Sequence, residues 1–286
     1  MAATVDDARR WYAEEIREVA EIRCDALIDA LARVPREAFL GPGPWQIVRP
    51  RPVGDVSYRT TPDADPRRLY HNVLVAIDPA RKLNNGQPSA VITWLDALEP
   101  KRGDRALHVG AGVGYYTAII ADAVGPSGSV IAIEADAELA ERARVNLATW
   151  PNVRVVAGDG ATCDPGAFDI GFINCGATKL MPAWLDHVAP GGRLHVPMTS
   201  EALKHGAMLL VRRDDGDRWP ARFTGGVAIY PCSGARDDDS DAALTELFKH
   251  GGVAKVQSVR RDAHERDDSC LMHRAGSCLS QLVPAR

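Results

Sequence analysis

Residues 106–118, ALHVGAGVGYYTA, decide the fold, because an apolar run leads through a glycine-rich turn into a helical pattern. Such a turn lets a ligand approach bare backbone at the carboxyl end of a strand. The dinucleotide fingerprint G-x-G-x-x-G has its third glycine where this chain has Tyr115, and Gly114 comes one residue early. The spacing therefore disfavours a pyrophosphate as the ligand.

Acidic residues follow at the ends of two further predicted strands. Glu134 closes the run SVIAIEA, where its carboxylate can accept hydrogen bonds from both hydroxyls of a ribose. Asp159 and Gly160 in AGDG end a third strand, where a carboxylate suits an adenine amino group. S-adenosylmethionine carries a ribose, an adenine and a sulfonium but no phosphate. We therefore expect it as the cofactor.

Composition narrows the class of protein. The 286 residues are 45% hydrophobic and 25% charged, with a net charge of -4, which gives no reason to expect a nucleic-acid partner. The charged start and the lack of a long apolar run predict neither a signal peptide nor a membrane span. Six scattered cysteines without a CxxC pair predict reduced thiols in a cytoplasmic protein. The eight histidines show no HExxH or similar spacing, so we expect no metal site.

The amino-terminal part of the chain is predicted to be helical and then irregular. Residues 6–40 repeat apolar side chains at three- and four-residue steps, which predicts helix. Glycines and prolines at 41–45 end that pattern. The segment 46–68 has no period and predicts an irregular surface excursion, and 70–78 predicts a short strand.

From residue 89 the pattern alternates between helices and strands. We predict helices at 89–98, 115–124 and 137–149, and strands at 105–110, 129–134, 153–157, 169–174 and 193–198. Continuous apolar strands that alternate with helices indicate a parallel sheet covered on both faces, a doubly wound α/β fold of the Rossmann-like kind.

The carboxyl-terminal part is predicted to add strands. Residues 207–213 and 225–232 read as strands around a polar turn, and APGGRL (189–194) reads as a turn. An acidic run at 236–241 reads as a solvated linker before a short helix, and the last segment predicts a hairpin around Ala275 and Gly276. We divide the chain into an amino-terminal substrate-side segment (1–79), a cofactor-binding core (80–234) and a carboxyl-terminal extension (235–286).

Several motifs together resemble those of the protein-L-isoaspartate O-methyltransferases. These are ALIDALARVPREAFL (26–40), NNGQPSAVITWLDAL (84–98), HVGAGVGYYTAIIADAVG (108–125), IEADAELAERARVNL (133–147), VVAGDG (155–160) and VAPGGRLHVPM (188–198). Their order matches too, and the RVPREAF element and the QP helix distinguish this family from other class I methyltransferases.

The resemblance implies a class I, S-adenosylmethionine-dependent fold and an enzyme that esterifies a carboxylate, typically that of an isoaspartyl residue. The residues it implies for the cofactor come from the ends of the predicted strands: His108, Gly110, Ala111, Gly112, Gly114, Tyr115, Glu134, Ala135, Asp159, Gly160 and Asn174.

Two positions depart from the family pattern. The family has a Thr-Ile-Ser segment whose hydroxyls touch the acceptor carboxylate, and this chain has Asn84, Asn85 and Gly86 there. The family also has an acidic residue two positions before the first glycine, where this chain has His108. The first departure concerns the acceptor, and the second concerns how the amino group of the cofactor is held.

The acceptor side is predicted from polar residues near these departures. Amides of Asn84, Asn85 and Gln87 can donate hydrogen bonds to a carboxylate, which is ionised at neutral pH and needs no general base. Asn174 and Cys175 lie where the acceptor edge of this fold is expected. A phenol or amine acceptor would instead need a base, for which His71, His108 and His195 are candidates.

The sequence therefore predicts a methyltransferase of the protein-L-isoaspartate type that acts on a peptide or protein carboxylate. The main alternative is methylation of a small metabolite or a biosynthetic peptide. A transfer-RNA base methyltransferase and a non-catalytic cofactor binder are further alternatives, and the net negative charge disfavours the former.

Overall fold

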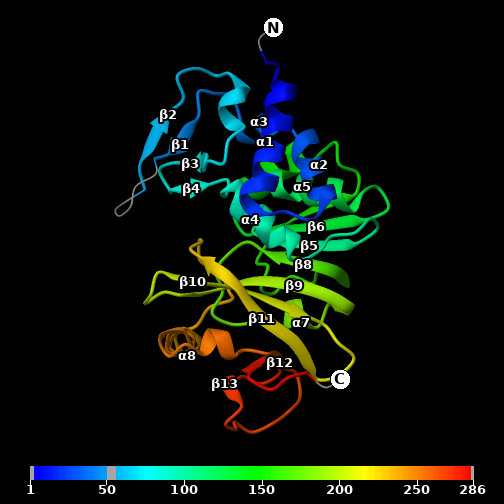
Figure 1. Ribbon diagram of the computed structural model, residues 1–286, viewed down its shortest axis with the longest axis vertical. Helices are drawn as coiled ribbons and strands as arrows, with labels where there is room; N and C mark the ends of the chain where they lie inside the picture. The colour runs from blue at the N-terminus through cyan, green and yellow to red at the C-terminus, as the bar shows by residue number, and fades with distance from the viewer. Residues whose placement is uncertain (1–2, 50–55, 285–286) are drawn as a thin grey trace. The chain divides into compact units, whose positions relative to one another are not determined.

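The structure, a computed structural model, describes residues 3–49 and 56–284 (Figure 1). The chain forms two compact units. Unit 1 comprises Met1–Gly103, Ala111–Val130 and Asp136–Val155, and unit 2 comprises Asp104–Gly110, Ile131–Ala135 and Val156–Arg286.

Helices dominate unit 1. They are α1 (Val5–Ala20), α2 (Asp25–Arg33), α3 (Glu37–Leu40), α4 (Pro88–Asp96), α5 (Tyr115–Val124) and α6 (Ala137–Asn146). Thr4 starts α1 with a capping box, since its side chain accepts from the Asp7 N–H and the Asp7 carboxylate accepts from the Thr4 N–H. The helical pattern predicted over 6–40 is in fact broken twice. Glu21 adopts left-handed backbone (φ 51°) after α1, and Pro35 keeps the preceding residue extended after α2.

Residues 46–49 and 56–68 are more regular than predicted, and residues 50–55 of the same predicted segment lie outside the described residues. β1 (Gln46–Val48) pairs in antiparallel with β2 (Tyr58–Thr60), and the 3₁₀ helix η1 (Pro66–Leu69) follows. The buried side of β1 belongs to a small apolar core of Leu40, Trp45, Ile47, Leu69 and Val75. A strand of three residues carries too short a pattern to be predicted from its sequence.

The strand predicted over 70–78 is wrong for most of its length. Only β3 (Ala76–Asp78) forms, and it pairs with β4 (Leu83–Asn84). The guanidinium of the buried Arg36 takes three backbone carbonyls of this stretch, those of Leu69, His71 and Val73. These carbonyls are therefore bound by a side chain and not by a neighbouring strand.

One ten-stranded sheet has the order β13-β14-β12-β11-β10-β9-β8-β5-β6-β7. Its strands are β5 (Arg105–Val109), β6 (Ser129–Glu134), β7 (Val153–Ala157), β8 (Phe168–Ile173), β9 (Val188–Ser200), β10 (His205–Arg212), β11 (Arg218–Val227), β12 (Ser258–Arg260), β13 (Cys270–Met272) and β14 (Cys278–Ser280). β8 pairs in parallel with both β5 and β9, as predicted. From β9 onward the pairs are antiparallel, because short turns join β9, β10 and β11.

Two strand boundaries differ from the prediction. β9 begins at Val188 and continues through the glycines predicted as a turn, with a register shift against β8 and left-handed backbone at Gly191 (φ 74°). β11 spans 218–227 and not 225–232, because Trp219 turns a buried side chain into the core of unit 2. The predicted hairpin around Ala275 and Gly276 is confirmed as β13 and β14.

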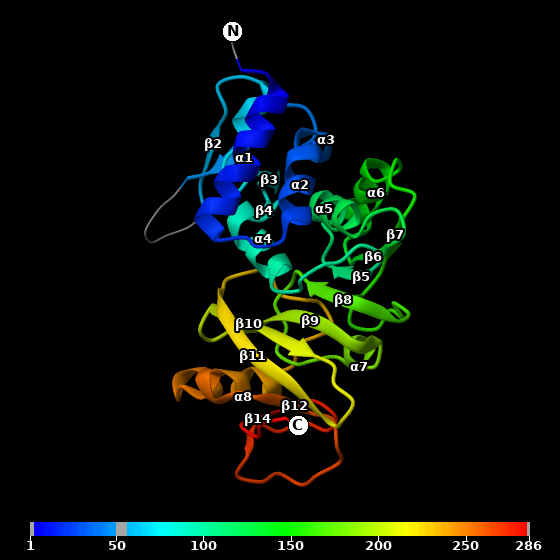
Figure 2. The ribbon, with the colours of Figure 1, turned by 45° about the vertical axis from the view of Figure 1, so that its right-hand side comes forward.

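The acidic run at 236–241 begins α8 (Asp238–Lys249) and is not a linker. Asp237 caps this helix by accepting from the Ser240 N–H at 2.7 Å, and its carboxylate pairs with Lys179 and Arg274. Acidic side chains in a first helical turn are stabilised by the partial positive charge there. α8 packs against β9 and β13. Figure 2 shows α8 in orange near the labelled strands β12 and β14.

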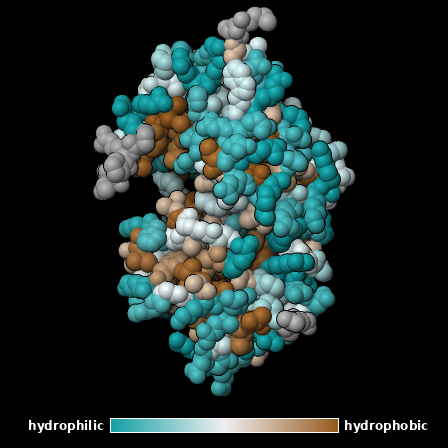
Figure 3. Space-filling model, in the orientation of Figure 1, coloured by the Kyte–Doolittle hydropathy of each residue, from teal (hydrophilic) through white to brown (hydrophobic). Residues whose placement is uncertain are grey.

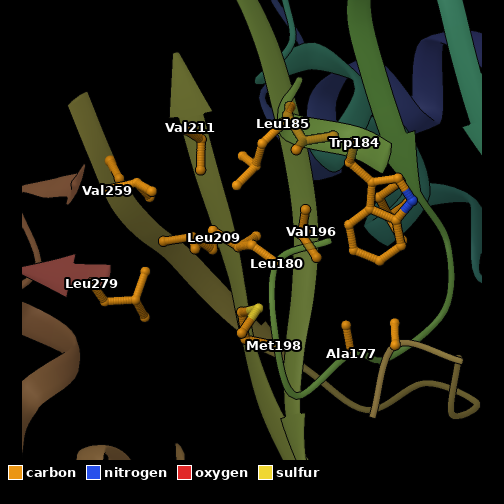
Figure 4. Close-up of a cluster of buried hydrophobic side chains, with 14 of the residues drawn as sticks. Ala177, Leu180, Trp184, Leu185, Val196, Met198, Leu209, Val211, Val259 and Leu279 are labelled. Carbon is orange, nitrogen blue, oxygen red and sulfur yellow. The ribbon is translucent and has the colours of Figure 1, made fainter. Parts of the chain in front are cut away.

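The core of unit 2 consists of side chains from α7 (Pro182–Leu185) and from both the parallel and the antiparallel strands of the sheet. Figure 4 shows these side chains pointing toward one another, among them Trp184, Leu185, Val196, Leu209 and Val259. All five are fully buried, and burial of a large apolar side chain contributes about 1.5–3 kcal/mol.

Hydrophilic side chains cover much of the face seen in Figure 3, with smaller apolar areas between them. Among the described residues, no helix combines the length and the apolar character that a membrane span requires.

Candidate functional site

The predicted cofactor residues of unit 2 lie at the carboxyl ends of adjoining strands. Backbone hydrogen bonds join these ends directly. The Gly110 N–H donates to the Ile133 carbonyl at 2.8 Å, and the Asn174 N–H donates to the Val109 carbonyl at 2.8 Å. The N–H of Gly158 donates to the Glu134 carbonyl at 2.9 Å. The structure therefore brings Gly110, Glu134, Asp159 and Asn174 together, as the sequence predicted.

Two glycines of this group are required by close packing. A Cβ on Gly110 would lie 3.1 Å from the Asn174 carbonyl oxygen, and the backbone of Gly110 is left-handed (φ 78°). A Cβ on Gly160 would overlap the Val109 side chain, and the Gly160 carbonyl accepts from Trp184 Nε1 at 2.6 Å. Both glycines are therefore required by the packing of the strand ends against one another.

Two carboxylates stand at these strand ends. Glu134 is 9% exposed, and Asp159 is half-buried with its Oδ1 accepting from the Ala161 N–H at 2.9 Å. A hydrogen bond with Cys232, burial and the negative charges of Glu134 and Asp159 together raise the pKa of Cys175. The Cys175 thiol therefore stays protonated at neutral pH and is unsuited to act as a nucleophile. Ala135, directly after Glu134, is exposed.

Gly234 completes this group and was not predicted. A Cβ at Gly234, which has φ 75°, would overlap the Asp159 carboxylate. The two residues are 75 positions apart in the chain, and no local pattern in the run CSGA marks the approach.

The two buried histidines of the core strands pack rather than face a ligand. His108 is fully buried, and its ring stacks on Phe172 with centroids 5.3 Å apart. Burial lowers the pKa of His108 to about 3. His195 is also fully buried, with Nε2 2.9 Å from Thr224 Oγ1. Neither imidazole is placed to serve as the general base considered from the sequence.

In unit 1 the rest of the glycine-rich turn leads into α5. Ala111 is buried, and Gly112 and Gly114 both have left-handed backbone, with φ 57° and 93°. A Cβ on Gly114 would lie 2.7 Å from Leu147 Cδ1, which follows α6. The early glycine that breaks the dinucleotide spacing is thus required by packing.

Tyr115 is a core residue of unit 1. Its side chain is fully buried, with its ring centroid 5.7 Å from that of Phe39 and 5.0 Å from that of Tyr116. The Arg36 guanidinium lies over the same ring at 5.8 Å. This packing favours a structural role for the Tyr115 side chain, in contrast to the cofactor contact predicted for it.

Asn84 and Asn85, at the predicted acceptor side, differ in the hydrogen bonds that their side chains make. Asn84 is locally bound, since its Nδ2 donates to the Lys82 carbonyl at 2.8 Å and its Oδ1 accepts from the Tyr58 hydroxyl at 3.1 Å. Asn85 is only 6% exposed, and among the described residues nothing accepts a hydrogen bond from its Nδ2. A buried amide donor without an acceptor is costly, and an acceptor atom of a ligand would remove that cost.

Gly86 explains the missing serine hydroxyl of the family. Its backbone is left-handed (φ 71°), and a Cβ would lie 3.0 Å from Val91 Cγ2 and 3.1 Å from Tyr116 Cε2. The Tyr116 hydroxyl also donates to the Gly86 carbonyl at 3.2 Å. A serine here would need strained left-handed backbone and a small shift of the Val91 and Tyr116 side chains.

The other acceptor candidates lie on the surface of unit 1. His71 and Gln87 are both exposed, and Gln87 precedes α4 without capping it through its side chain. Asn72 supplies that contact instead, since its Oδ1 accepts from the Ser89 N–H at 3.0 Å. Their exposure leaves both predicted side chains free to move, whereas Asn85 is held in place.

An open cavity of about 470 Å³ in unit 1 is not part of the candidate site. It is lined by residues that include Arg33, Asp122, Trp150 and Asn152. Gly128, which also lines it, directly precedes β6, whereas Glu134 ends that strand.

A sequence model described as "Protein-L-isoaspartate(D-aspartate) O-methyltransferase (PCMT)" matches residues 62–231. The chain belongs to this family. A protein-L-isoaspartate O-methyltransferase of Methanothermobacter thermautotrophicus is 27% identical over 80% of this chain and 96% of its own length. The enzyme of that name from Ignicoccus hospitalis is 32% identical over 69% of this chain and 84% of its own.

Solved structures show the same fold. A protein-L-isoaspartate O-methyltransferase covers 83% of this chain and 69% of its own, with a TM-score of 0.60 and 19% identity. A putative enzyme of that kind from Plasmodium falciparum, solved in complex with S-adenosyl-L-homocysteine, covers 79% of this chain and 98% of its own, with a TM-score of 0.59 and 16% identity.

Family membership confirms the main predictions from the sequence. The chain is a class I, S-adenosylmethionine-dependent methyltransferase with an α/β fold. The family match ends at residue 231, so the carboxyl-terminal extension lies outside it.

Proposed function

We propose that this family member methylates carboxylates of isoaspartyl residues in peptides or proteins. Relatives that are 27% and 32% identical to this chain over the aligned residues carry the name of that activity. The observation that carries the proposal is the buried Asn85 amide, whose Nδ2 has no acceptor among the described residues. A carboxylate accepts hydrogen bonds and donates none, so it is the complementary partner for this group.

We propose that the strand ends of unit 2 hold the cofactor. The Glu134 carboxylate would accept from the ribose hydroxyls, and Asp159 would accept from the adenine amino group. The position of Gly110, Glu134 and Asn174 at adjoining strand ends supports this assignment, because ligands of open α/β sheets bind at the carboxyl ends of the strands.

The chemistry asks little of the protein beyond positioning. When bound, S-adenosylmethionine supplies a methyl group that passes from its sulfonium to a carboxylate oxygen, leaving a methyl ester and S-adenosylhomocysteine. An isoaspartyl carboxylate is ionised at neutral pH, so no residue has to remove a proton. Asn85 would orient the acceptor oxygen, and positioning of this kind supplies a large part of the rate. The burial of His108 and His195 agrees with a reaction that needs no base.

The experiment uses the full chain, cofactor labelled in its methyl group, and two peptides that differ only in one residue. One peptide has an isoaspartyl residue, and the other has a normal aspartyl residue at the same position. We expect base-labile label on the isoaspartyl peptide alone. Label on neither peptide, from protein that binds the cofactor, contradicts the proposed acceptor.

A second acceptor class is favoured by one observation. Gly86 stands where the family carries a serine, so this chain has no hydroxyl there to contact the acceptor. A biosynthetic peptide or small metabolite with a differently presented carboxylate would fit this change. Label in an extract of the source cells, with none on the isoaspartyl peptide, would favour this class.

We propose further that the segment 1–79 serves the substrate side, that 80–234 binds the cofactor, and that 235–286 is an added extension. We also propose that the protein acts in the cytoplasm, which its six free cysteines support. Fractionation of source cells would test this location.

A further inference from the structure

Four potential metal ligands gather in the carboxyl-terminal extension, outside the family match. They are His264, Cys270, His273 and Cys278, and one ligand atom from each lies within 4.8 Å of all the others. His264 lies in the loop between β12 and β13, and Cys270 lies in β13. His273 lies in the turn after β13, and Cys278 lies in β14. The fold of the hairpin thus brings together residues spread over 15 positions of the chain.

We propose that these four residues bind a structural zinc ion. Two thiolates and two imidazoles are a ligand set that zinc prefers, in tetrahedral geometry. With ordinary zinc–sulfur and zinc–nitrogen bonds, the ligand atoms of such a site lie about 3.4–3.8 Å apart. The observed cluster is therefore close to that size and needs only a small contraction around the ion.

The orientation of His264 is that of a metal ligand. Its Nδ1 is 3.0 Å from the backbone carbonyl of Asp262, and its Nε2 is 3.5 Å from the Cys270 Sγ. Donation from Nδ1–H to the carbonyl leaves the Nε2 lone pair directed at the centre of the cluster. Ligand histidines in proteins are generally held in this way by an oxygen behind them.

His273 supplies an independent observation. Its Nδ1 is buried, and among the described residues it has no hydrogen-bond partner. Its ring stands nearly perpendicular to that of His264, with centroids 4.9 Å apart. A buried imidazole nitrogen without a partner is costly, and a metal ion would satisfy it.

The two cysteines of the cluster are both buried. Cys278 is fully buried and Cys270 is 8% exposed. The backbone N–H of Asp267 donates to the Cys270 Sγ at 3.4 Å, and the Cys270 thiol donates to the Asp267 carboxylate at 3.4 Å. A metal ion would replace the thiol proton and leave the N–H donor in place.

One arginine supports both sides of the cluster. Arg260, which is 8% exposed, pairs with Asp262 behind His264 and with Asp267 behind Cys270, each at 2.8 Å. Arg260 thereby links β12 to the residues that orient two of the four ligands. Metal sites in proteins generally have such contacts, which hold the ligand side chains in place, whereas a chance cluster of ligand-type residues need not have them.

Four protein ligands leave no position open for substrate or water, so the ion would be structural. It would cross-link the loop after β12 to the β13–β14 hairpin. A short hairpin of this kind buries little apolar surface and gains stability from such a link. The proposal departs from the expectation of no metal site, because H-x₅-C-x₂-H-x₄-C is not a common spacing.

The first test is the zinc content of the purified full chain. We expect about one zinc per chain in the wild-type protein and loss of most of it in Cys278→Ser and His273→Gln. Cys24→Ser and His250→Gln are matched controls, because Cys24 is in α2's N-cap position and His250 is exposed. Both controls should keep the wild-type zinc content.

The second test does not depend on the folding of any variant. Cobalt(II) exchanged into the wild-type protein should show the visible absorption of tetrahedral cobalt with sulfur ligands. A chelator should lower the midpoint of thermal unfolding by several degrees, and zinc should restore it. Wild-type protein that neither retains zinc nor develops this cobalt absorption overturns the proposal. A Cys270–Cys278 disulfide in protein kept under reducing conditions also overturns it.

Discussion

Gly110 and Asn174 lock two adjoining strand ends together. The Nδ2 of Asn174 donates to the Gly110 carbonyl at 3.3 Å, and the Asn174 carbonyl lies where a side chain on Gly110 would begin. The glycine-rich turn is therefore shaped by the end of β8 as well as by its own sequence. A substitution at either residue should therefore weaken cofactor binding at the proposed site.

Gly110→Ala should weaken the binding of S-adenosylhomocysteine at least tenfold, which corresponds to about 1.4 kcal/mol. Left-handed backbone costs an L residue about 1–2 kcal/mol, and the new Cβ would push Asn174 away. Calorimetric titration measures the effect. Gly166→Ala is the matched control, because Gly166 has φ 64° with no neighbouring atom in the way. An unchanged dissociation constant for Gly110→Ala would show that this turn does not hold the cofactor.

Asn85→Ala should lower kcat/KM for the isoaspartyl peptide about 10- to 100-fold, since a hydrogen bond to a charged group contributes about 1.5–3 kcal/mol. The dissociation constant for S-adenosylhomocysteine should not change. Asn84→Ala should have a smaller effect, because the Asn84 amide is already bound to Lys82 and Tyr58. Steady-state kinetics with both variants would separate the two asparagines. Equal losses at both positions would contradict the role proposed for Asn85.

Arg36→Met should lower the free energy of unfolding by about 3–5 kcal/mol, the usual effect of breaking a buried charged network. The guanidinium is fully buried and holds three backbone carbonyls, which methionine would leave unpaired. Arg10→Met should cost less than about 1 kcal/mol, since the Arg10 ion pair with Asp7 is exposed. Denaturant unfolding of both variants gives the comparison. A loss at Arg36 no larger than that at Arg10 would refute this account of residues 69–73.

His108 should make the protein less stable as the pH falls. Burial lowers the pKa of His108 from 6.5 to about 3, so the unfolded chain binds a proton that the folded chain does not. Its stabilising contribution is complete above pH 6.5 and decreases as the pH falls toward 3. Between pH 7 and pH 5 the free energy of unfolding should drop by about 2 kcal/mol from this group alone. The free energy of unfolding of His108→Leu should fall by about 2 kcal/mol less than that of the wild type over this pH range. An identical pH dependence in the two proteins would contradict the burial of a neutral imidazole.

The elements that the sequence predicted well are those with complete local patterns. β5, α5 and β6 each combine an apolar run with a glycine or an acidic residue at the end, and all three form close to the predicted bounds. The positions of Gly110 and Glu134 follow from the ends of β5 and β6, and that of Asp159 follows from the end of β7. The reason is that a parallel strand places its last residue at the edge where ligands bind.

The features that the sequence did not predict depend on contacts between distant residues. The sequence gives no sign that Arg36 is buried, because it resembles the other charged residues of an amphipathic helix. Its guanidinium binds backbone carbonyls of residues 69–73, and the strand predicted there does not form. His108 and Tyr115 read as ligand-facing positions, but Phe172 and Phe39 provide packing partners that no local pattern reveals. The cysteines and histidines of the extension are similarly scattered until the β13–β14 hairpin folds.

The most direct test of the central claim, that the strand ends of unit 2 bind a sulfonium nucleoside, is a calorimetric titration with S-adenosylhomocysteine and, separately, with NAD. The account predicts one binding site for S-adenosylhomocysteine per chain, no heat with NAD, and about tenfold or greater weakening in Glu134→Gln but not in the exposed Glu141→Gln. Binding of NAD by protein that ignores S-adenosylhomocysteine would contradict it.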